Sequence, residues 1–483
     1  MNILRELEPQ NVFYYFEEIS KIPHISFHEK EISNYCVSFA QTHGLEHYQD
    51  EMYNVVIIKE ATKGYEHVPA IIIQGHLDMV GDKTTDCTIE MEKESIRLLL
   101  EGDYLTADQT TLGGDDGIAV AYALALLAAD DISHPRLEVV LTVSEEVGLL
   151  GATGIDLSMC KGRRLINIDS EEEGIITAGC AGGVRALCEV PMRREHKEGV
   201  CVRIAIEGLL GGHSGIAIAE GRANANLLIG RFLLQLEGQV SYALDRMWGG
   251  AKDNVIPKDA VAEIIVDKAD YPKVEEQAVL FVQYMKAEYG TADPDILLTV
   301  CKKDEGVFFP LITESQEKVV TLLSLMPNGV QSMSADIKGL VETSLNLGVA
   351  KLQGRKMELD FALRSSVPSS KEALAKKVAW LTTVMGGTTT FHGDYPAWVY
   401  DKESGFRMRC MEIYKEMYEE EAKVEIIHAG LECGILSNKL PGLECISIGP
   451  NMYDVHTPNE RISISSVARV WEYLKKILED RED

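Results

Sequence analysis

The sequence predicts an α/β protein with a mostly parallel sheet covered by helices on both faces, plus an inserted α+β domain with an antiparallel sheet. Short apolar runs at residues 55–59, 70–74, 137–143 and 163–169 alternate with helical segments, which is typical of parallel sheets. Acidic and histidine side chains gather where these runs end, as expected at the carboxyl edge of such a sheet. From about residue 186 the apolar residues alternate with polar ones, which predicts half-exposed strands of a second domain.

The first part of the main domain is expected to cover residues 1–186. Helices are predicted at residues 11–20, 28–44 and 118–129. The last of these, IAVAYALALLAA, is rich in alanine and leucine and apolar on every side, which is typical of a buried helix. The strands listed above separate these helices, so the chain alternates between the two kinds of element.

The insertion is expected to cover residues 187–392, and residues 393–483 then complete the main domain. Its first strand, 200-VCVRIAIE-207, alternates in the manner of a half-exposed strand and is broken by 208-GLLGGHSG-215. Further strands are predicted at 261–266, 296–300, 342–348 and 356–364, and helices at 224–237, 273–289, 315–325 and 371–385. After the insertion, 444-ECISIGP-450 predicts another buried strand of the main sheet, and residues 465–478 a closing helix.

The charge balance excludes several classes of partner. The 483 residues include 47 basic and 76 acidic ones, a net charge of −29, which argues against nucleic acids and anionic membranes. No apolar run approaches the length of about 18 residues that a membrane helix needs. No secretory signal is visible and the ten cysteines are scattered, so reduced thiols in the cytoplasm are the expectation.

Five segments place candidate metal ligands at the ends of strands or the beginnings of helices. They are 76-HLD-78, 114-GDDG-117, 144-SEE-146, 167-NIDSEEEG-174 and 456-HTP-458. Each segment alone is weak, but burying so many carboxylates without a cation would be unfavourable because of desolvation and repulsion. Histidines with carboxylates form a nitrogen and oxygen donor set suited to zinc, manganese or cobalt.

In their order along the chain, these motifs resemble those of the dinuclear zinc exopeptidases and aminoacylases. The segments QGHLDMV, TTLGGDDGIA, NIDSEEEGIITAGCAGG, GGHSG, NVIP, VETSLNLGV, IIHAGLECG, SIGP and HTPNE together resemble the aminoacyl-histidine dipeptidase branch along essentially the whole chain. GGHSG alone is typical only of the broad family. The resemblance implies metal-dependent hydrolysis of dipeptides, preferentially Xaa-His such as β-alanyl-histidine, through a metal-bridged water.

The resemblance also implies a role for each motif residue. Two divalent ions, zinc before manganese or cobalt, are expected to be bound by His76, Asp115, Glu146, Asp169 and His456. Asp115 is expected to bridge both ions, Asp78 to orient the imidazole of His76, and Glu145 to act as the general base. The two adjacent glutamates would then have different roles, because Glu146 would bind a metal ion and Glu145 would accept and donate the proton.

Four residues of the insertion and the segment after it are implied in substrate binding: His213, Asn254, Arg364 and Gly430. His213 in GGHSG is expected to stabilise the oxyanion, within one subunit or across a homodimer, although a loop-capping role is the alternative. A guanidinium such as that of Arg364 matches a carboxylate with paired donors. Asp116 stands where many relatives have asparagine, which we expect to affect metal binding but not to remove activity.

Related activities share this metal core and stay open at the level of sequence. They are those of a tripeptidase, a broader dipeptidase and an N-acyl amino acid deacylase. A protein that kept the fold and lost catalysis is a further alternative, but it would have no need for an unligated acid at Glu145. The physiological dipeptide and the native metal are not specified by these motifs.

Overall fold

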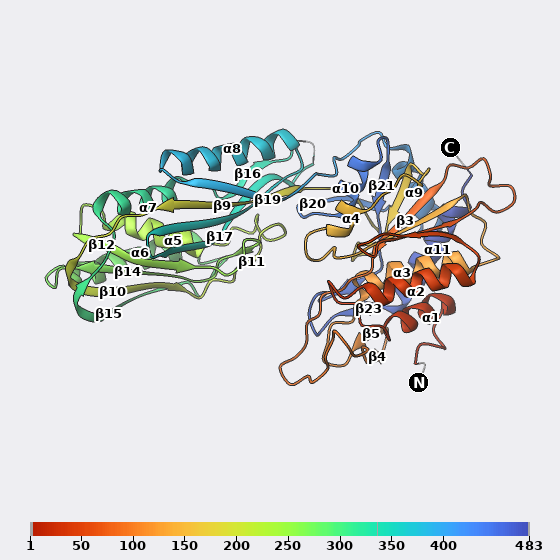
Figure 1. Ribbon diagram of the computed structural model, residues 1–483, viewed down its shortest axis with the longest axis horizontal. Coiled ribbons are helices and arrows are strands. Elements are labelled where there is room, and N and C mark those ends of the chain that lie inside the picture. The colour runs from red at the N-terminus through yellow and green to blue at the C-terminus, as the bar shows by residue number, and fades with distance from the viewer. Residues whose placement is uncertain (1–2, 336, 482–483) are drawn as a thin grey trace. The chain divides into compact units, whose positions relative to one another are not determined.

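The computed structural model describes residues 3–335 and 337–481, which form two compact units (Figure 1). Unit 1 comprises the chain up to Gly179, Tyr400–Ile426 and the chain from Leu431 onward. Unit 2 comprises Cys180–Val399 together with Ile427–Gly430. In Figure 1 the ribbon of unit 1 therefore runs from red to golden yellow and resumes in darker blue, and that of unit 2 runs from yellow through green to light blue. No helix in the described ranges is both long and apolar enough to cross a membrane.

Unit 1 is built on an eight-stranded sheet whose central strands are parallel. The order is β1-β2-β6-β3-β7-β21-β8-β20, and β3 runs parallel to both β6 and β7, as β21 does to β7. The strands are β1 (Glu46–Gln49), β2 (Val55–Lys59), β3 (Ile71–His76), β6 (Leu137–Thr142), β7 (Arg164–Asn167), β8 (Ile175–Cys180), β20 (Lys423–Ile427) and β21 (Glu444–Ser447). The predicted fold class, a mostly parallel sheet with a second antiparallel sheet, is confirmed.

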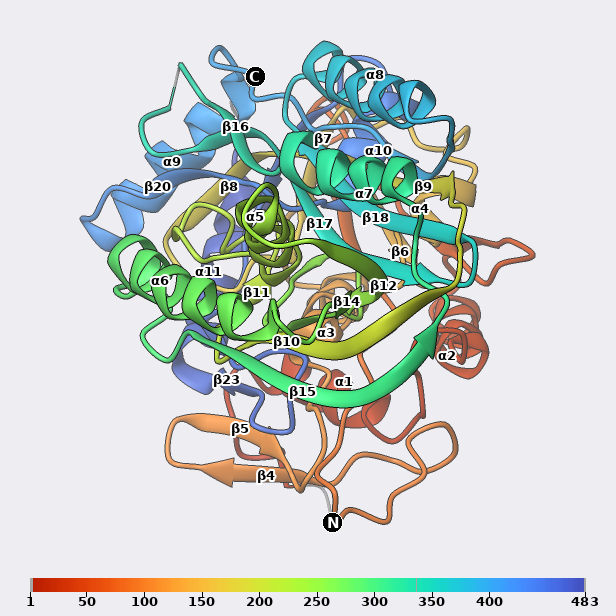
Figure 2. The same ribbon diagram turned by 90° about the vertical axis from the view of Figure 1, so that its left-hand side faces the viewer.

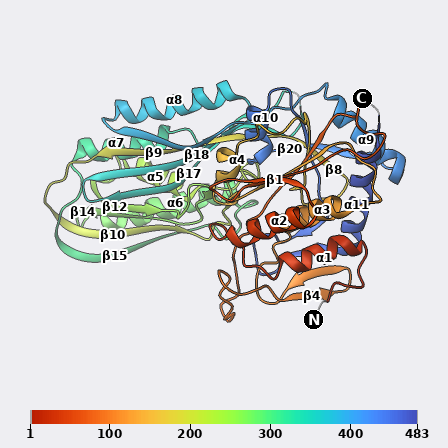
Figure 3. The ribbon, with the colours of Figure 1, turned by 45° about the vertical axis from the view of Figure 1, so that its right-hand side comes forward.

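Helices bury both faces of this sheet, which explains the continuous apolar runs of its strands. The helices of unit 1 are α1 (Gln10–Ile19), α2 (Lys30–Thr42), α3 (Gly114–Ala128), α4 (Leu150–Gly154), α9 (Gly405–Tyr418), α10 (Glu432–Lys439) and α11 (Ile464–Glu479). Helix α3 is buried on all sides, and Figure 3 shows it beside α1. Its Tyr122 ring stacks on Trp471 of α11 at a centroid distance of 5.8 Å. The central helix therefore has apolar neighbours all around it.

A small four-stranded sheet completes unit 1, with the order β22-β23-β5-β4. Its strands are β4 (Leu98–Glu101), β5 (Tyr104–Ala107), β22 (Met452–Tyr453) and β23 (Arg461–Ser463). It joins the segment that precedes α3 to the segment that precedes α11, and so brings together parts of the chain far apart in sequence.

Unit 2 is an antiparallel sheet with helices on one face. The main path is β15-β10-β14-β12-β17-β18-β9-β19, and β16 pairs with β17. Its strands are β9 (Gly182–Pro191), β10 (Lys197–Glu207), β12 (Tyr242–Gly249), β14 (Ala260–Val266), β15 (Leu297–Phe308), β16 (Gly329–Met333), β17 (Val341–Gln353), β18 (Lys356–Ser365) and β19 (Thr388–Tyr395), and a separate pair joins β11 (Gly212–His213) to β13 (Val255–Ile256). Helices α5 (Ala225–Leu236), α6 (Tyr271–Tyr289), α7 (Thr313–Leu325) and α8 (Pro368–Val384) share one apolar core with this sheet (Figure 2).

Several strands of unit 2 differ from the sequence expectation in extent. Strand β15 runs to Phe308, whereas the apolar pattern predicted an end at residue 300, because its second half is a charged edge strand with exposed Lys302, Lys303 and Glu305. Strands β9, β12, β16 and β19 were not predicted. Of these, β19 lies at an edge of the sheet, and edge strands are commonly polar, which hides the alternation that identifies a strand.

Candidate active site

The predicted ligands of unit 1 meet at the carboxyl edge of its main sheet. His76 ends β3, Glu145 and Glu146 follow β6, and Asp169 follows β7, and these three strands are neighbours in the order β6-β3-β7. Asp115 lies in the first turn of α3. His456, the remaining predicted ligand, comes from the loop between β22 and β23. Parallel strands place their ends together, so this edge collects side chains from distant parts of the chain.

Asp115 lies between the two histidines, with one oxygen facing each ring. Its Oδ1 is 3.1 Å from His76 Nε2, and its Oδ2 is 3.0 Å from His456 Nε2. Glu146 Oε1 lies 2.6 Å from His456 Nε2, and Asp169 Oδ1 lies 3.8 Å from His76 Nε2. Ligand atoms of a tetrahedral zinc ion are about 3.3 Å apart for bonds of about 2.05 Å. The distances of 3.1 and 3.0 Å from Asp115 to the two histidines are close to that spacing, so Asp115 would be able to contact an ion beside each histidine. The 2.6 Å between Glu146 and His456 is a hydrogen-bond distance.

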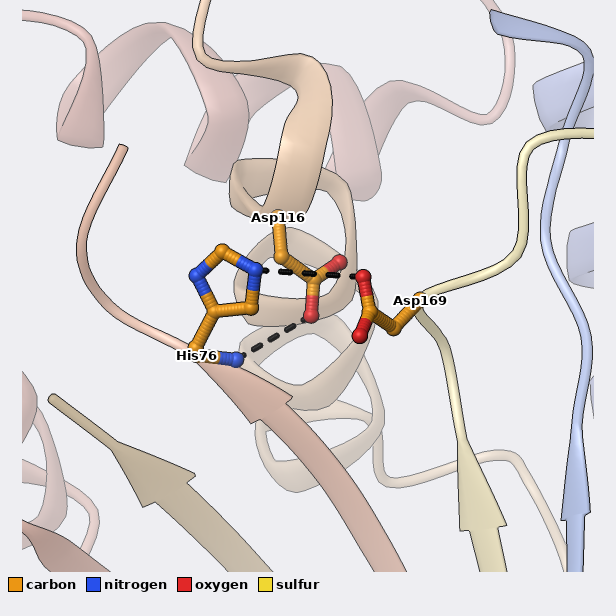
Figure 4. Close-up of side chains that lie close together, drawn as sticks. All are labelled: His76, Asp116 and Asp169. Atoms are coloured by element: carbon orange, nitrogen blue, oxygen red, sulfur yellow. Dashed lines mark hydrogen bonds and ion pairs between the residues drawn. The ribbon is translucent and has the colours of Figure 1, made fainter. Parts of the chain in front are cut away.

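Asp116 lies beside His76 (Figure 4). The backbone N–H of His76 donates to Asp116 Oδ2 at 3.1 Å, while Asp116 Oδ1 is buried without a hydrogen-bond partner among the described residues. Burial and the nearby Asp115 carboxylate raise the pKa of Asp116 well above its usual value. Asp116 with His76 and Asp169 is therefore one of the groups able to hold a cation.

The site as a whole has excess negative charge. Burial and the neighbouring carboxylates raise the pKa values of Glu145 and Asp169 well above those of ordinary acids. Although burial lowers the pKa of His456, its hydrogen bonds to Asp115 and Glu146 raise it to about 11. Such shifts indicate that the carboxylates require positive charge nearby. A divalent cation would supply that charge, so the residues present fit a metal centre.

Asp78 supports the two glutamates as well as the first histidine. Its carboxylate accepts hydrogen bonds from the backbone N–H groups of Glu145 at 2.9 Å and Glu146 at 3.3 Å, and from Ser26 Oγ at 2.8 Å. His76 Nδ1 lies 2.8 Å from the backbone carbonyl oxygen of Asp78 and 3.5 Å from its carboxylate. The imidazole is thus oriented by the carbonyl group, while the carboxylate holds the loop that bears the glutamates.

Glu460 was not identified from the sequence, yet it holds the loop that bears Asp115. Its Oε2 accepts from the backbone N–H groups of Leu112 at 2.8 Å and Gly113 at 3.1 Å, and its Oε1 from those of Gly114 at 2.8 Å and Asp115 at 3.3 Å. It is only 2% exposed. Glu460 lies four residues after His456 in HTPNE, so one short loop provides a ligand and anchors another.

A buried polar network lies behind the ligands, on the sheet face that meets α10. Gln74 precedes His76 by two residues and donates from Nε2 to Glu432 Oε2 at 2.5 Å. The same oxygen accepts from Thr142 Oγ1 at 2.6 Å, and Asn167 Nδ2 donates to Gln74 Oε1 at 2.6 Å. Burial raises the pKa of Glu432 to about 7. The network connects β3, β6 and β7 immediately before their ligand-bearing ends.

The predicted substrate-binding residues lie in unit 2. Arg364 is the penultimate residue of β18 and is 9% exposed, and its NH2 group lies 3.3 Å from His213 Nε2. Asn254 is half-buried, and its carbonyl oxygen accepts from the backbone N–H of Ser214 at 2.8 Å, next to His213. Gly430 lies against the ring of Tyr395, whose hydroxyl accepts from Arg364 NH1 at 3.0 Å. The structure thus brings these four residues into one neighbourhood.

His213 contacts Arg364 and also lies within hydrogen-bond distance of two backbone amides. Its Nδ1 is 3.3 Å from the backbone nitrogen of Gly215 and 3.4 Å from that of Ile216, and its Nε2 is 3.3 Å from the NH2 group of Arg364, which can only donate. With the ring proton on Nε2, an anionic oxygen would accept from both groups at once, which would make this pair suited to a carboxylate or an oxyanion.

The buried side chain of His428 is expected to make the stability of unit 2 depend on pH. Burial and the positive charge of Arg364 lower its pKa from 6.5 to about 4, and its Nε2 lies 2.7 Å from Ser344 Oγ. Between these pH values the unfolded chain binds a proton that the folded chain does not. The free energy of unfolding should therefore fall as pH drops from 6.5 to 4, by up to about 3 kcal/mol.

Urea unfolding at pH 7 and pH 4.5 measures this effect in the wild type and in His428→Gln. We expect the variant to lose less stability on acidification, while His392→Gln, which alters an exposed histidine of the same unit, should follow the wild type. Equal losses in all three proteins would show that His428 is not the group responsible.

The main sheet of unit 1 carries histidine and carboxylate donors at its carboxyl edge, with an additional glutamate beside them. Such an arrangement is typical of metal-dependent hydrolases. The chain belongs to peptidase family M20/M25/M40, whose model matches residues 72–480. This membership confirms the resemblance noted in the sequence and the expectation of a metallopeptidase.

Two relatives match over nearly the whole length. The cytosol non-specific dipeptidase of Escherichia coli is 36% identical, with 99% of each chain covered. The crystal structure of aminoacylhistidine dipeptidase from Vibrio alginolyticus superimposes with a TM-score of 0.88 at 33% identity, and also covers 99% of each chain. Aminopeptidase PepT from Bacillus cereus shares the fold, with a TM-score of 0.55, 14% identity and 98% of each chain covered.

Proposed function

We propose that this protein is a metal-dependent dipeptidase that favours dipeptides ending in histidine, such as β-alanyl-histidine. The observation that supports it most is the position of Asp115 between His76 and His456, with Glu145 next to the candidate ligand Glu146. The relatives named as dipeptidases support the substrate class, and the Vibrio enzyme's name supports the preference for histidine. The E. coli enzyme's name, which says non-specific, favours a broader dipeptidase as the second candidate.

Each residue of the unit 1 site has a role in this proposal. His76 and Asp169 would hold one ion, Glu146 and His456 would hold the other, and Asp115 would contact both. Zinc suits this donor set best, and manganese or cobalt also suit it. When bound, two such ions polarise the scissile carbonyl and lower the pKa of a water molecule toward neutrality.

Glu145 transfers the proton of the attacking water in this proposal. As the water attacks the scissile carbonyl, the Glu145 carboxylate accepts its proton and later passes it to the leaving amine. Asp78 positions Glu145 through the hydrogen bond from its backbone N–H. The Asp78 carboxylate accepts hydrogen bonds from the backbone N–H groups of both Glu145 and Glu146. It therefore fixes the position of the proposed base relative to that of the proposed ligand.

His213, Asn254, Arg364 and Gly430 form the substrate-binding group of this proposal. Arg364 binds the substrate carboxylate with its guanidinium, and His213 donates from Nε2 to the developing oxyanion. His213 acts in its own subunit or across a homodimer, which is the assembly we propose. The lid role of the inserted domain, expected at residues 187–392, and a cytoplasmic location are part of the same proposal.

Hydrolysis of a small substrate panel by zinc- or manganese-loaded protein tests the proposal. The panel contains β-alanyl-histidine, glycyl-histidine, leucyl-glycine, a tripeptide and N-acetyl-ornithine, each with a chelator control. We expect chelator-sensitive cleavage of the dipeptides, fastest for those that end in histidine. Equal rates on all dipeptides would favour the broader enzyme, and cleavage of only the tripeptide or the acetylated amino acid would reject the dipeptidase assignment.

A further inference from the structure

Arg364, Gly183 and Tyr395 form one row across three neighbouring strands. Gly183 of β9 pairs with Arg364 of β18 on one side and with Tyr395 of β19 on the other. Directly paired residues point to the same face of a sheet, and two strand spacings amount to about 9.5 Å. A side chain on β19 reaches one on β18 only if it is long and the residue between them leaves room.

Glycine at position 183 leaves that room for the tyrosine ring. A Cβ atom at Gly183 would lie 2.4 Å from the Tyr395 hydroxyl oxygen and 2.5 Å from Cζ, so the ring lies directly over this glycine. A Cβ atom at Gly430 would lie 2.8 Å from Cε2 of the same ring. The ring is therefore packed between two glycines, and neither position has space for a side chain.

The backbone of Tyr395 is held as well. Lys371 Nζ donates to its carbonyl oxygen at 2.7 Å, and the pairing of β19 with β9 shifts register between His392 and Tyr395. Such a bulge re-aims the residues that follow it. The tyrosine is thus directed along the row toward Arg364 by the strand that bears it.

The guanidinium at the end of the row is buried without a counter-charge. Its NH1 group donates to the Tyr395 hydroxyl at 3.0 Å, and Arg364 is 9% exposed. Among residues 3–335 and 337–481, no carboxylate forms an ion pair with it. A buried cation is stable only when paired, and a hydroxyl supplies orientation rather than charge. The buried guanidinium of Arg364 is therefore suited to bind an anionic ligand.

We propose that Tyr395 is a positioning residue, which lies over Gly183 and holds the Arg364 guanidinium in the orientation that receives the α-carboxylate of a dipeptide. The inference rests on the proposed function for the identity of the ligand. The position of the Tyr395 ring also explains why glycine stands at positions 183 and 430. The ring occupies the space that a side chain at either position would need.

Binding of glycyl-histidine and of its C-terminal amide, measured by calorimetry, tests the proposal. The metal-loaded Glu145→Gln protein serves as the parent because loss of the proposed base is expected to slow turnover during the measurement. Tyr395→Phe keeps the ring and removes the hydroxyl, and we expect it to weaken binding of the free carboxylate about tenfold. Binding of the amide should change less than twofold. Tyr284→Phe, at an exposed tyrosine of the same unit, is the matched control and should change neither.

An Arg364→Ala background distinguishes positioning from general loss of structure. If Tyr395 acts through Arg364, Tyr395→Phe should add less than twofold to the effect of Arg364→Ala. Equal weakening of the carboxylate and the amide, no weakening at all, absence of binding by the parent, or full additivity with Arg364→Ala would each overturn the inference. The wild-type substrate panel tests the proposed function separately, because it does not depend on Tyr395.

Discussion

Replacement of Glu145 by glutamine is expected to lower kcat by about 10²- to 10⁴-fold while the metal content stays unchanged. Glutamine keeps the shape of the side chain and the backbone N–H that donates to Asp78, but it cannot accept the proton of the attacking water. Hydrolysis of β-alanyl-histidine and elemental analysis of the same sample measure the two quantities together. The combination of full metal content with lost turnover identifies a base rather than a ligand.

Two companion variants make this result specific. Glu146→Gln should lose metal as well as activity, because Glu146 Oε1 lies 2.6 Å from His456 Nε2 in the candidate ligand set. Glu172→Gln removes an equal charge from an exposed position and should leave both quantities unchanged. Hydrolysis by Glu145→Gln at the wild-type rate would mean that another group takes the proton.

Replacement of Glu460 by glutamine should weaken metal affinity by about 10- to 100-fold, the range found when a group supporting a ligand is lost. Both carboxylate oxygens accept backbone N–H groups from Leu112 to Asp115. An amide nitrogen in place of one oxygen would face two donors, and each lost bond to a charged acceptor costs about 1.5–3 kcal/mol. The loop with Asp115 would then move relative to His456.

Metal titration monitored by calorimetry, together with thermal unfolding of the metal-free protein, tests this expectation. Glu472→Gln alters an exposed glutamate of α11 that pairs with Lys475, and surface pairs of this kind contribute little. It should match the wild type in both measurements. Unchanged metal affinity in Glu460→Gln would show that the loop keeps its place without the carboxylate.

The main features of unit 1 could be predicted from its sequence because its strands are continuous apolar runs that end in polar residues. The runs before His76 and Asp169, and the run before Glu145, are local signals that need no knowledge of the fold. Their convergence followed from the general rule that parallel strands share one carboxyl edge. Helix α3 was equally recognisable, because only a fully buried helix is apolar on every side.

Other parts of the site depend on pairings that one sequence does not reveal. The contact of Glu460 with four successive amides requires β23 to pair with β5, which lies about 350 residues earlier in the chain. The row of Arg364, Gly183 and Tyr395 depends on the register of β9 between β18 and β19. Strand β19 itself escaped prediction because its residues are mostly exposed and polar.

The tetrapeptide Ile427–Gly430 belongs to unit 2 although it lies outside the insertion in sequence, and this limits how the genes of related proteins can recombine. A gene exchange that replaced only Cys180–Val399 with the segment of a relative would leave this tetrapeptide behind. The incoming side chain at position 395 would then have to pack against Gly430, where a residue larger than glycine would clash with the ring of Tyr395. Recombination within the family should therefore preserve the tetrapeptide and the insertion as a matched pair, although the segment Tyr400–Ile426 separates them along the chain.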